Sequence, residues 1–166
     1  MSGYSVMEIK IGVLSDTHLR KVTREFKEIY DTYLADKDMI LHAGDHVSTD
    51  VVDFLSRKDF HGVHGNMDPI EVKEVLPEKT IIELGKYRLG MTHGWGPSAG
   101  LEGRVRLEFN DVDVIVYGHS HHAVNHIKDG VLIFNPGTAT GFSAKGIHTI
   151  GILELGDTIH GEIIRI

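Results

Sequence analysis

Five short segments, far apart in the sequence, contain side chains that bind divalent metal ions in proteins. They are Asp16-Thr17-His18, Gly44-Asp45, Gly65-Asn66-Met67-Asp68, Thr92-His93-Gly94 and Gly118-His119-Ser120-His121. Carboxylate, imidazole and carboxamide groups offer the oxygen and nitrogen donors that suit Mn, Fe, Co, Ni or Zn. Each segment alone could be a helix cap, a polar turn or a surface loop. Together, in one small chain, they predict a metal-centred active site.

Short apolar runs precede most of these segments and are expected to be strands. Strands are predicted at 9–14, 39–41, 60–63, 80–84, 87–91 and 112–117, followed by hairpins that pair 124–127 with 131–134 and 149–155 with 159–166. Helices are predicted at 23–34, where Thr23 can cap the start, and at 50–56 and 101–109. No linker or repeat divides the chain, so we expect one domain, 1–166, of the α/β class. The order favours two packed sheets with helices outside.

Five candidate ligands come just after the carboxyl end of an expected strand: Asp16, Asp45, Asn66, His93 and His119. Loops at these ends converge around a crevice in open α/β sheets. Asp16 and His18 are two residues apart, as are His119 and His121, so in extended backbone each pair projects to one side. His122 would then point elsewhere. The placement of the motifs supports the same site as their chemistry.

Composition narrows the function classes. The chain of 166 residues is 41% hydrophobic and 25% charged, as in a globular protein, and has no cysteine for disulfides or thiolate ligands. Its net charge of −7 argues against a protein whose main function is to bind the phosphates of long nucleic acid. Basic residues near the motifs, such as Arg104, are expected to be solvated. No apolar stretch is long enough for a membrane span, and the N-terminus does not read as a signal peptide, so a cytoplasmic protein is expected.

The ordered set of motifs resembles the calcineurin-like metallophosphoesterase superfamily. The resemblance runs from Ile9 to beyond Asn135-Pro136-Gly137. The short chain, without an inserted capping segment, is most similar to the small bacterial and archaeal phosphodiesterase branch, which also contains the retromer scaffold subunit. The resemblance implies a layered αββα sandwich of two mixed β-sheets flanked by helices.

The resemblance also implies two divalent metal ions, with Mn expected first and Fe, Ni, Co or Zn as alternatives. The first ion would be held by Asp16, His18 and His121. The second would be held by Asn66, His93 and His119. Asp45 would bridge both ions, and Asp45, Asn66 and His93 would form the catalytic core.

The implied activity is hydrolysis of a small phosphodiester or nucleotide-like molecule by a metal-bound hydroxide, because coordination can lower the pKa of water from 15.7 to about 7. Two alternatives stay open. A non-catalytic scaffold would keep the fold without the chemistry, and a nuclease would act on DNA. The C-terminal hairpins could also pair between subunits, which would give a homo-oligomer.

Residues around the motifs raise further expectations. Many members of the superfamily carry a histidine after the motif asparagine, where this chain has Met67, which cannot donate a proton. His46 and His122 are candidates to replace it. Asp68 is expected to orient a ligand from outside the site rather than to bind metal. Trp95 could stack on substrate or simply pack. The remaining histidines are expected to be structural or exposed.

Overall fold

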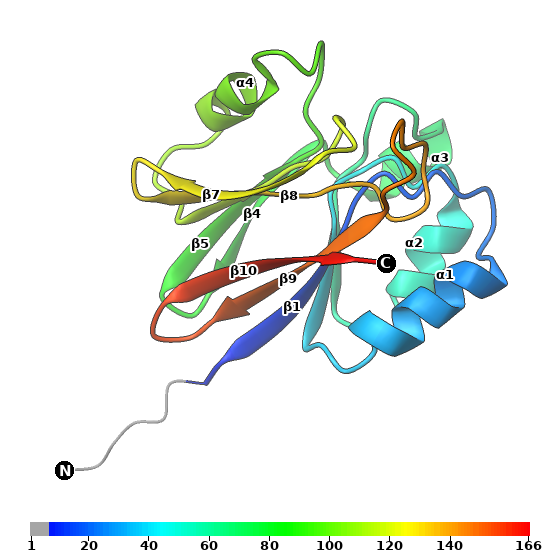
Figure 1. The fold of residues 1–166 in the computed structure, drawn as a ribbon, viewed down its shortest axis with the longest axis horizontal. Helices are drawn as coiled ribbons and strands as arrows, with labels where there is room; N and C mark the ends of the chain where they lie inside the picture. The colour runs from blue at the N-terminus through cyan, green and yellow to red at the C-terminus, as the bar shows by residue number, and fades with distance from the viewer. Residues whose placement is uncertain (1–6) are drawn as a thin grey trace.

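A computed structural model describes residues 7–166 and contains two five-stranded β-sheets (Figure 1). The first sheet consists of β1 (Ile9–Leu14), β2 (Met39–His42), β3 (Phe60–Gly62), β9 (Thr149–Leu155) and β10 (Ile159–Arg165), in the order β10-β9-β1-β2-β3. Strands β1, β2 and β3 are parallel, whereas β9 runs antiparallel to both β1 and β10. This sheet is therefore mixed.

The second sheet has the same mixed character. It consists of β4 (Lys79–Leu84), β5 (Tyr87–Thr92), β6 (Val114–Val116), β7 (Ala123–Lys128) and β8 (Val131–Pro136), in the order β4-β5-β6-β8-β7. Strands β5, β6 and β8 are parallel, and the two edge strands are antiparallel to their neighbours. The β7–β8 turn has positive φ at both Asp129 and Gly130, which is the conformation of a tight hairpin turn.

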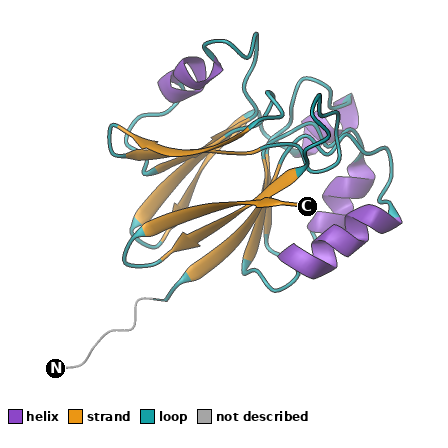
Figure 2. Ribbon diagram, in the orientation of Figure 1, coloured by secondary structure: helices purple, strands orange, loops and turns teal. Residues whose placement is uncertain are grey.

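Helices cover the outer faces of the two sheets (Figure 2). They are α1 (Arg24–Ile29), the π-helical segment η1 (Tyr30–Leu34), α2 (Thr49–Leu55), α3 (Ile70–Val75) and α4 (Leu101–Leu107). The Thr23 hydroxyl accepts a hydrogen bond from the Phe26 amide at 3.1 Å, so the expected cap of the first helix is present. None of the helices in the described range is long and apolar enough to cross a bilayer.

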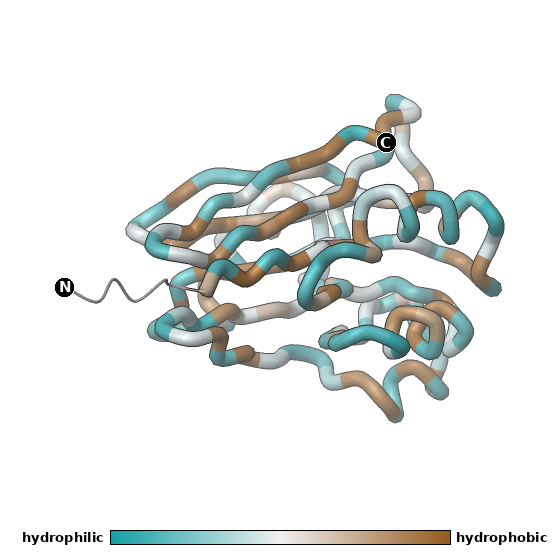
Figure 3. The backbone as a smooth tube through the Cα atoms, turned by 90° about the horizontal axis from the view of Figure 1, so that it is seen from below, coloured by the Kyte–Doolittle hydropathy of each residue, from teal (hydrophilic) through white to brown (hydrophobic). Residues whose placement is uncertain are grey.

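Three hydrophobic clusters hold these layers together. The central cluster joins the inner faces of both sheets, for example Val13 and Leu41 from one sheet and Met91 and Phe134 from the other. A second cluster packs α1, η1 and α2 against the first sheet, and a third packs α4 against the second sheet. Along the backbone, hydrophobic residues follow the strands and hydrophilic residues gather at the turns (Figure 3). The expected αββα sandwich of two mixed sheets is therefore confirmed.

Two local expectations differ from the structure, and one helix was not predicted. The predicted helix 23–34 changes character at Tyr30, because the Ala35 amide donates to the Tyr30 carbonyl, five residues back, at 2.9 Å. Helix α3 was not predicted, since only Val72 of its six residues is buried and no apolar face appears in the sequence. The strand predicted at 112–117 is confined to Val114–Val116.

Candidate metal centre

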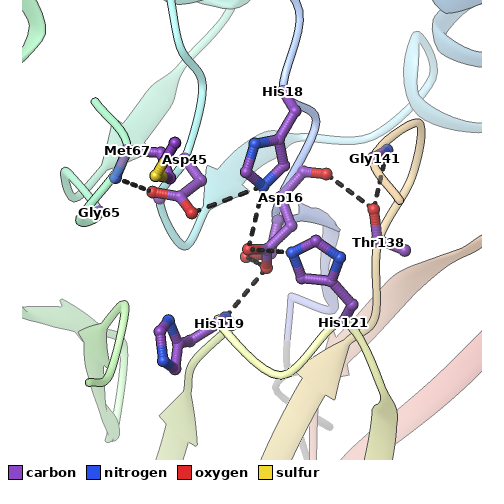
Figure 4. A network of polar contacts seen from close by, with 12 residues as sticks. Asp16, His18, Asp45, Gly65, Met67, His119, His121, Thr138 and Gly141 are labelled. Carbon is purple, nitrogen blue, oxygen red and sulfur yellow. Dashed lines mark hydrogen bonds and ion pairs between the residues drawn. The ribbon is translucent and has the colours of Figure 1, made fainter. Parts of the chain in front are cut away.

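The expected ligands lie where strands of both sheets end. Strands β1, β2 and β3 of the first sheet lead into the loops of Asp16, Asp45 and Asn66, and β5 and β6 of the second lead into those of His93 and His119. These loops meet at one place, where side chains from both sheets face one another (Figure 4). The placement expected from the strand ends is thus observed.

One group of side chains surrounds the buried carboxylate of Asp16. Its Oδ1 atom lies 3.2 Å from Nε2 of His121 and 3.7 Å from Nε2 of His18. Asp45 Oδ2 approaches the same His18 nitrogen at 3.5 Å. Asp16, His18 and His121 form one of the two groups of the described residues whose donor atoms are close enough to share a metal ion.

The other group consists of Asp16, Asp45 and His93. His93 Nε2 lies 3.3 Å from Asp45 Oδ2 and 3.9 Å from Asp16 Oδ1. Asn66 adjoins this group, because its Oδ1 atom is 3.1 Å from His93 Nε2 and 3.2 Å from His119 Nδ1. Asp16 therefore belongs to both groups. Asp45 Oδ2 also contacts one histidine of each group, His18 and His93.

Each aspartate uses one carboxylate oxygen to hold the loops and leaves the other for the cluster. Asp16 Oδ2 accepts hydrogen bonds from the Ser15 hydroxyl at 2.6 Å and the His119 amide at 3.0 Å. Asp45 Oδ1 accepts from the Met67 amide at 2.8 Å. The loops from different strands are thereby tied to the carboxylates that face the cluster.

The histidines are oriented in the same way by backbone carbonyls. His93 Nδ1 donates to the Ala43 carbonyl at 2.7 Å, and His121 Nδ1 donates to the Phe142 carbonyl at 2.6 Å. His119 is reversed, because its Nε2 donates to the Gly96 carbonyl at 2.8 Å. In a neutral imidazole the second ring nitrogen is an acceptor. Once it has lost its proton, each ring can therefore turn a lone pair toward the cluster.

Such a convergence of acceptors fits a metal ion. Asn66 Oδ1 is itself an acceptor and faces the lone-pair nitrogens of His93 and His119. Asp16 Oδ1 and His18 Nε2 are buried without a hydrogen-bond partner among residues 7–166. Buried polar atoms are nearly always paired, so these converging atoms need positive charge between them, which either protons on the histidines or a divalent ion supplies. The donor set therefore fits divalent metal.

The backbone at these residues is strained rather than extended. Five candidate ligands have positive φ: Asp16 (53°), His18 (48°), Asp45 (59°), His119 (70°) and His121 (62°). The expectation that the paired ligands lie in extended backbone was wrong. The left-handed region costs of order 1–3 kcal/mol per non-glycine residue and persists mainly at functional sites. Tight loops, rather than strand alternation, turn both members of each pair inward.

Glycine is required at three positions next to the candidate ligands, because neighbouring loops approach closely there. A Cβ atom on Gly65 would lie 2.2 Å from Asp45 Oδ1, and one on Gly118 would lie 1.9 Å from the Ser15 hydroxyl. A Cβ on Gly44 would come within 2.6 Å of His93 Nδ1. Loops from separate strands therefore reach one another only because these positions carry no side chain.

Comparison with known proteins assigns the chain to a family. Residues 9–158 match the calcineurin-like phosphoesterase superfamily domain. The chain belongs to this superfamily. A phosphodiesterase of Methanocaldococcus jannaschii is 29% identical over 94% of this chain and 99% of its own length. A probable metallophosphoesterase of the same organism is 34% identical, covering 94% of this chain and 81% of its own. The resemblance drawn from the motifs and the class of enzyme, a phosphoesterase, are confirmed.

A solved structure supports the fold. Vacuolar protein sorting 29 from Cryptosporidium parvum has a TM-score of 0.73 to this phosphoesterase, covering 96% of this chain and 98% of that chain. The sequence identity is 24%, so the likeness concerns the fold alone.

The carboxylates of the site favour the protonated form of two of its histidines. The Asp16 carboxylate raises the pKa of His121 to about 9, against the opposing effect of burial. Burial lowers the pKa of His93, but the Asp45 and Asp16 carboxylates outweigh it and raise that pKa above its usual value. Burial also raises the pKa of Asp16, yet contacts with His121 and His18 bring it far below its usual range. Metal binding must therefore displace protons from the histidines.

Asp68 acts as the sequence indicated, from outside the metal cluster. Its carboxylate accepts hydrogen bonds from the amides of Asp45, Val47 and Gly65 at 2.6–3.0 Å and lies 3.2 Å from His46 Nδ1. The His46 contact and the backbone amides lower the pKa of Asp68 although burial raises it. Asp68 therefore fastens the loop of Asp45 to the loop of Asn66.

Two neighbouring histidines are structural. His46 is fully buried, which excludes it as a proton donor to a substrate. It stacks on His42 with ring centroids 3.6 Å apart. His42 Nδ1 accepts from the Gly44 amide at 3.1 Å, and its Nε2 lies 3.0 Å from the Thr17 hydroxyl. His42 thus joins the first two metal-facing loops, a role the sequence did not reveal because it depends on contact between loops.

The glycine-rich segment after His93 forms one rim of the site. The Arg104 guanidinium donates to the carbonyls of Trp95 and Ala99 at 2.8–3.1 Å and to that of Pro97. Arg104 was expected to be a solvated charge, so this role was missed. Trp95 is 45% exposed at this rim. Its side chain is therefore only partly packed.

Proposed function

We propose that this chain is a metal-dependent phosphodiesterase that hydrolyses a small phosphodiester or nucleotide-like substrate with two divalent ions. The observation that carries the proposal is the convergence of side-chain atoms from five loops. Two of these atoms, Asp16 Oδ1 and His18 Nε2, are buried without a hydrogen-bond partner within residues 7–166. Superfamily membership and similarity to an archaeal phosphodiesterase along almost the whole chain support it.

The proposed ligand sets are those that the resemblance implies. The first set matches one donor group, whereas the second adds Asn66 and His119 to His93 of the other group. Asp16, His18 and His121 would hold one ion, Asn66, His93 and His119 the other, and Asp45 would bridge them. When bound, a pair of divalent ions supplies positive charge to the phosphate oxygens and acidifies the attacking water. The mixed nitrogen and oxygen donors suit Mn first, with Fe, Ni, Co or Zn as alternatives.

The protein's own residues set how strongly the site attracts an anion. Only Asp16 and Asp45 among the seven ligands are carboxylates, and Asn66 is neutral. Two divalent ions would therefore keep about half of their charge. Asn66 is exposed, and so is Met67 beside it, so a diester with two organic groups can reach this side of the site.

The absence of an acid at Met67 limits protonation of the leaving group. His46 is fully buried, whereas His122 is exposed and close in sequence to His121. We therefore assign proton delivery to His122 or to bulk water. Diesters with good leaving groups should react best, because they need little help from a general acid.

A reconstitution assay tests the proposed activity. The metal-free chain is loaded with Mn²⁺ and hydrolysis of bis(p-nitrophenyl) phosphate is measured, with metal content determined by elemental analysis. Asp16→Asn removes a proposed metal ligand, so it should lower kcat/KM by more than roughly 10–100-fold. That range is the usual cost of losing a residue that only orients a metal ligand. His126→Asn is the control, because His126 is exposed, contacts Glu102 and is not one of the candidate ligands.

The scaffold alternative rests on the structural likeness to vacuolar protein sorting 29. A complete set of seven candidate ligands favours catalysis over a scaffold. Metal loading without hydrolysis of any phosphate ester would favour the scaffold instead. Hydrolysis of single-stranded DNA at moderate salt would favour the nuclease alternative.

A further inference from the structure

A pocket of about 440 Å³ opens directly beside the metal-facing histidines. We call it the Phe142 pocket. It is lined by residues of two segments, 119–123 and 142–149. Its size lies in the range of small-molecule binding sites, roughly 300–1,000 Å³. Two of its lining residues, His119 and His121, are also candidate metal ligands, so the pocket and the metal centre form one continuous site.

The apolar part of this pocket is exposed without an evident structural reason. Phe142 is 78% exposed and Ile147 is 36% exposed. With Ala123 and Ala144 they give the pocket a largely apolar wall. Exposed apolar residues that gather in one pocket, rather than lying singly on the surface, indicate a surface that a ligand covers.

The loop that carries Phe142 is fixed to the metal centre. The Phe142 carbonyl accepts from His121 Nδ1 at 2.6 Å. The Thr138 hydroxyl donates to the Asp16 carbonyl at 2.7 Å and accepts from the Gly141 amide at 2.8 Å (Figure 4). The Thr140 hydroxyl donates to the Thr17 carbonyl at 2.6 Å. The pocket wall is therefore placed by the same backbone that places Asp16 and His121.

The charge of the lining selects against cationic groups. Among the lining residues, Lys145 carries a fixed positive charge and none is acidic. A neutral or anionic group with a flat apolar ring matches this wall, because Phe142 can stack on it and Ile147 can pack against it. A small aliphatic group would leave most of the apolar wall in water.

We propose that the Phe142 pocket binds one organic group of the phosphodiester and selects a flat aromatic ring, either an aryl group or a nucleobase. This inference rests on the proposed phosphodiesterase function and specifies its substrate class. The phosphate would lie at the metal centre while the ring lies against Phe142. Phe142 thereby determines specificity without taking part in the chemistry.

The test compares two diesters in the Mn²⁺-loaded protein. Bis(p-nitrophenyl) phosphate carries aromatic rings, whereas ethylene phosphate is a strained cyclic diester without one, and its hydrolysis is followed by phosphorus NMR. Phe142→Ala should lower the ratio of their kcat/KM values roughly tenfold, as expected for loss of one ring stacking with its buried area. The kcat/KM for ethylene phosphate and the metal content should stay at wild-type values.

Further variants separate specificity from structure. Ile147→Ala should lower the same ratio by a smaller factor, and Phe142→Trp should preserve it. Leu107→Ala is the matched control, because Leu107 is an equally exposed apolar residue on α4, outside the pocket. A thymidine p-nitrophenyl diester distinguishes an aryl group from a nucleobase. If Phe142→Ala lowers kcat/KM more for this diester than for bis(p-nitrophenyl) phosphate, the pocket selects a nucleobase.

The outcomes distinguish the inference from the function beneath it. An unchanged ratio in Phe142→Ala, or an equal loss for both diesters, would overturn the specificity role while leaving the phosphodiesterase intact. Wild-type protein that hydrolyses neither diester after metal loading would instead overturn the proposed function.

Discussion

The aspartates of the site each divide their carboxylate between two tasks. One oxygen accepts hydrogen bonds from the loops, and the other faces the histidines, as the contacts of Asp16 with Ser15 and His121 show. The sequence predicted which residue types meet here, because carboxylate and imidazole are metal donors. It did not predict the positive φ of the paired ligands, since a period of two suggested extended backbone and the actual turns depend on contacts between loops.

Met67 is the residue where this chain departs from the superfamily motif, and it offers a direct test of proton delivery. Its side chain is 59% exposed beside Asp45. Met67→His should raise kcat for diesters with poor leaving groups, by up to the roughly 10²–10⁴-fold that a general acid contributes, and should change little for p-nitrophenyl esters. The measurement is kcat across a leaving-group series. A uniform effect across that series would contradict this account, and Met67→Gln is the matched control.

At the scale of elements, the strand ends were predictable and the loops between them were not. Apolar runs identified the strands that end before Asp16, Asp45 and His93. Helix α3 escaped prediction because it buries a single residue. The Phe142 pocket escaped as well, because it forms between segments 119–123 and 142–149, and its apolar side chains lie in a loop without periodicity.

Gly65 tests the close approach of two of these loops. Gly65→Ala should destabilise the protein by about 1–3 kcal/mol, the usual cost of overpacking, because the new Cβ would collide with Asp45 Oδ1. It should also lower metal affinity. Gly103→Ala is the matched control, since Gly103 lies in α4 with open space around it, and there alanine should be neutral or stabilising. Chemical denaturation and metal titration measure both effects, and wild-type values for Gly65→Ala would contradict the packing argument.

At the scale of the whole molecule, the candidate metal centre lies where the two sheets meet. Asp16, Asp45 and Asn66 follow strands of the first sheet, whereas His93, His119 and His121 follow strands of the second. Ions bound among them would link the two sheets at one end of the shared core. Ligand binding to the folded state alone stabilises it, so metal should raise the thermal midpoint.

Titration of the metal-free protein with Mn²⁺, followed by calorimetry and thermal unfolding, tests the central claim most directly. We predict two ions per chain and a rise in midpoint of roughly 5–10 °C for each ion at a hundredfold excess over Kd. Asp45→Asn should reduce both the stoichiometry and the rise, whereas Asp157→Asn, in an exposed turn, should reduce neither. Saturation with fewer than two ions in the wild type, or an Asp45→Asn variant that binds like the wild type, would contradict the account.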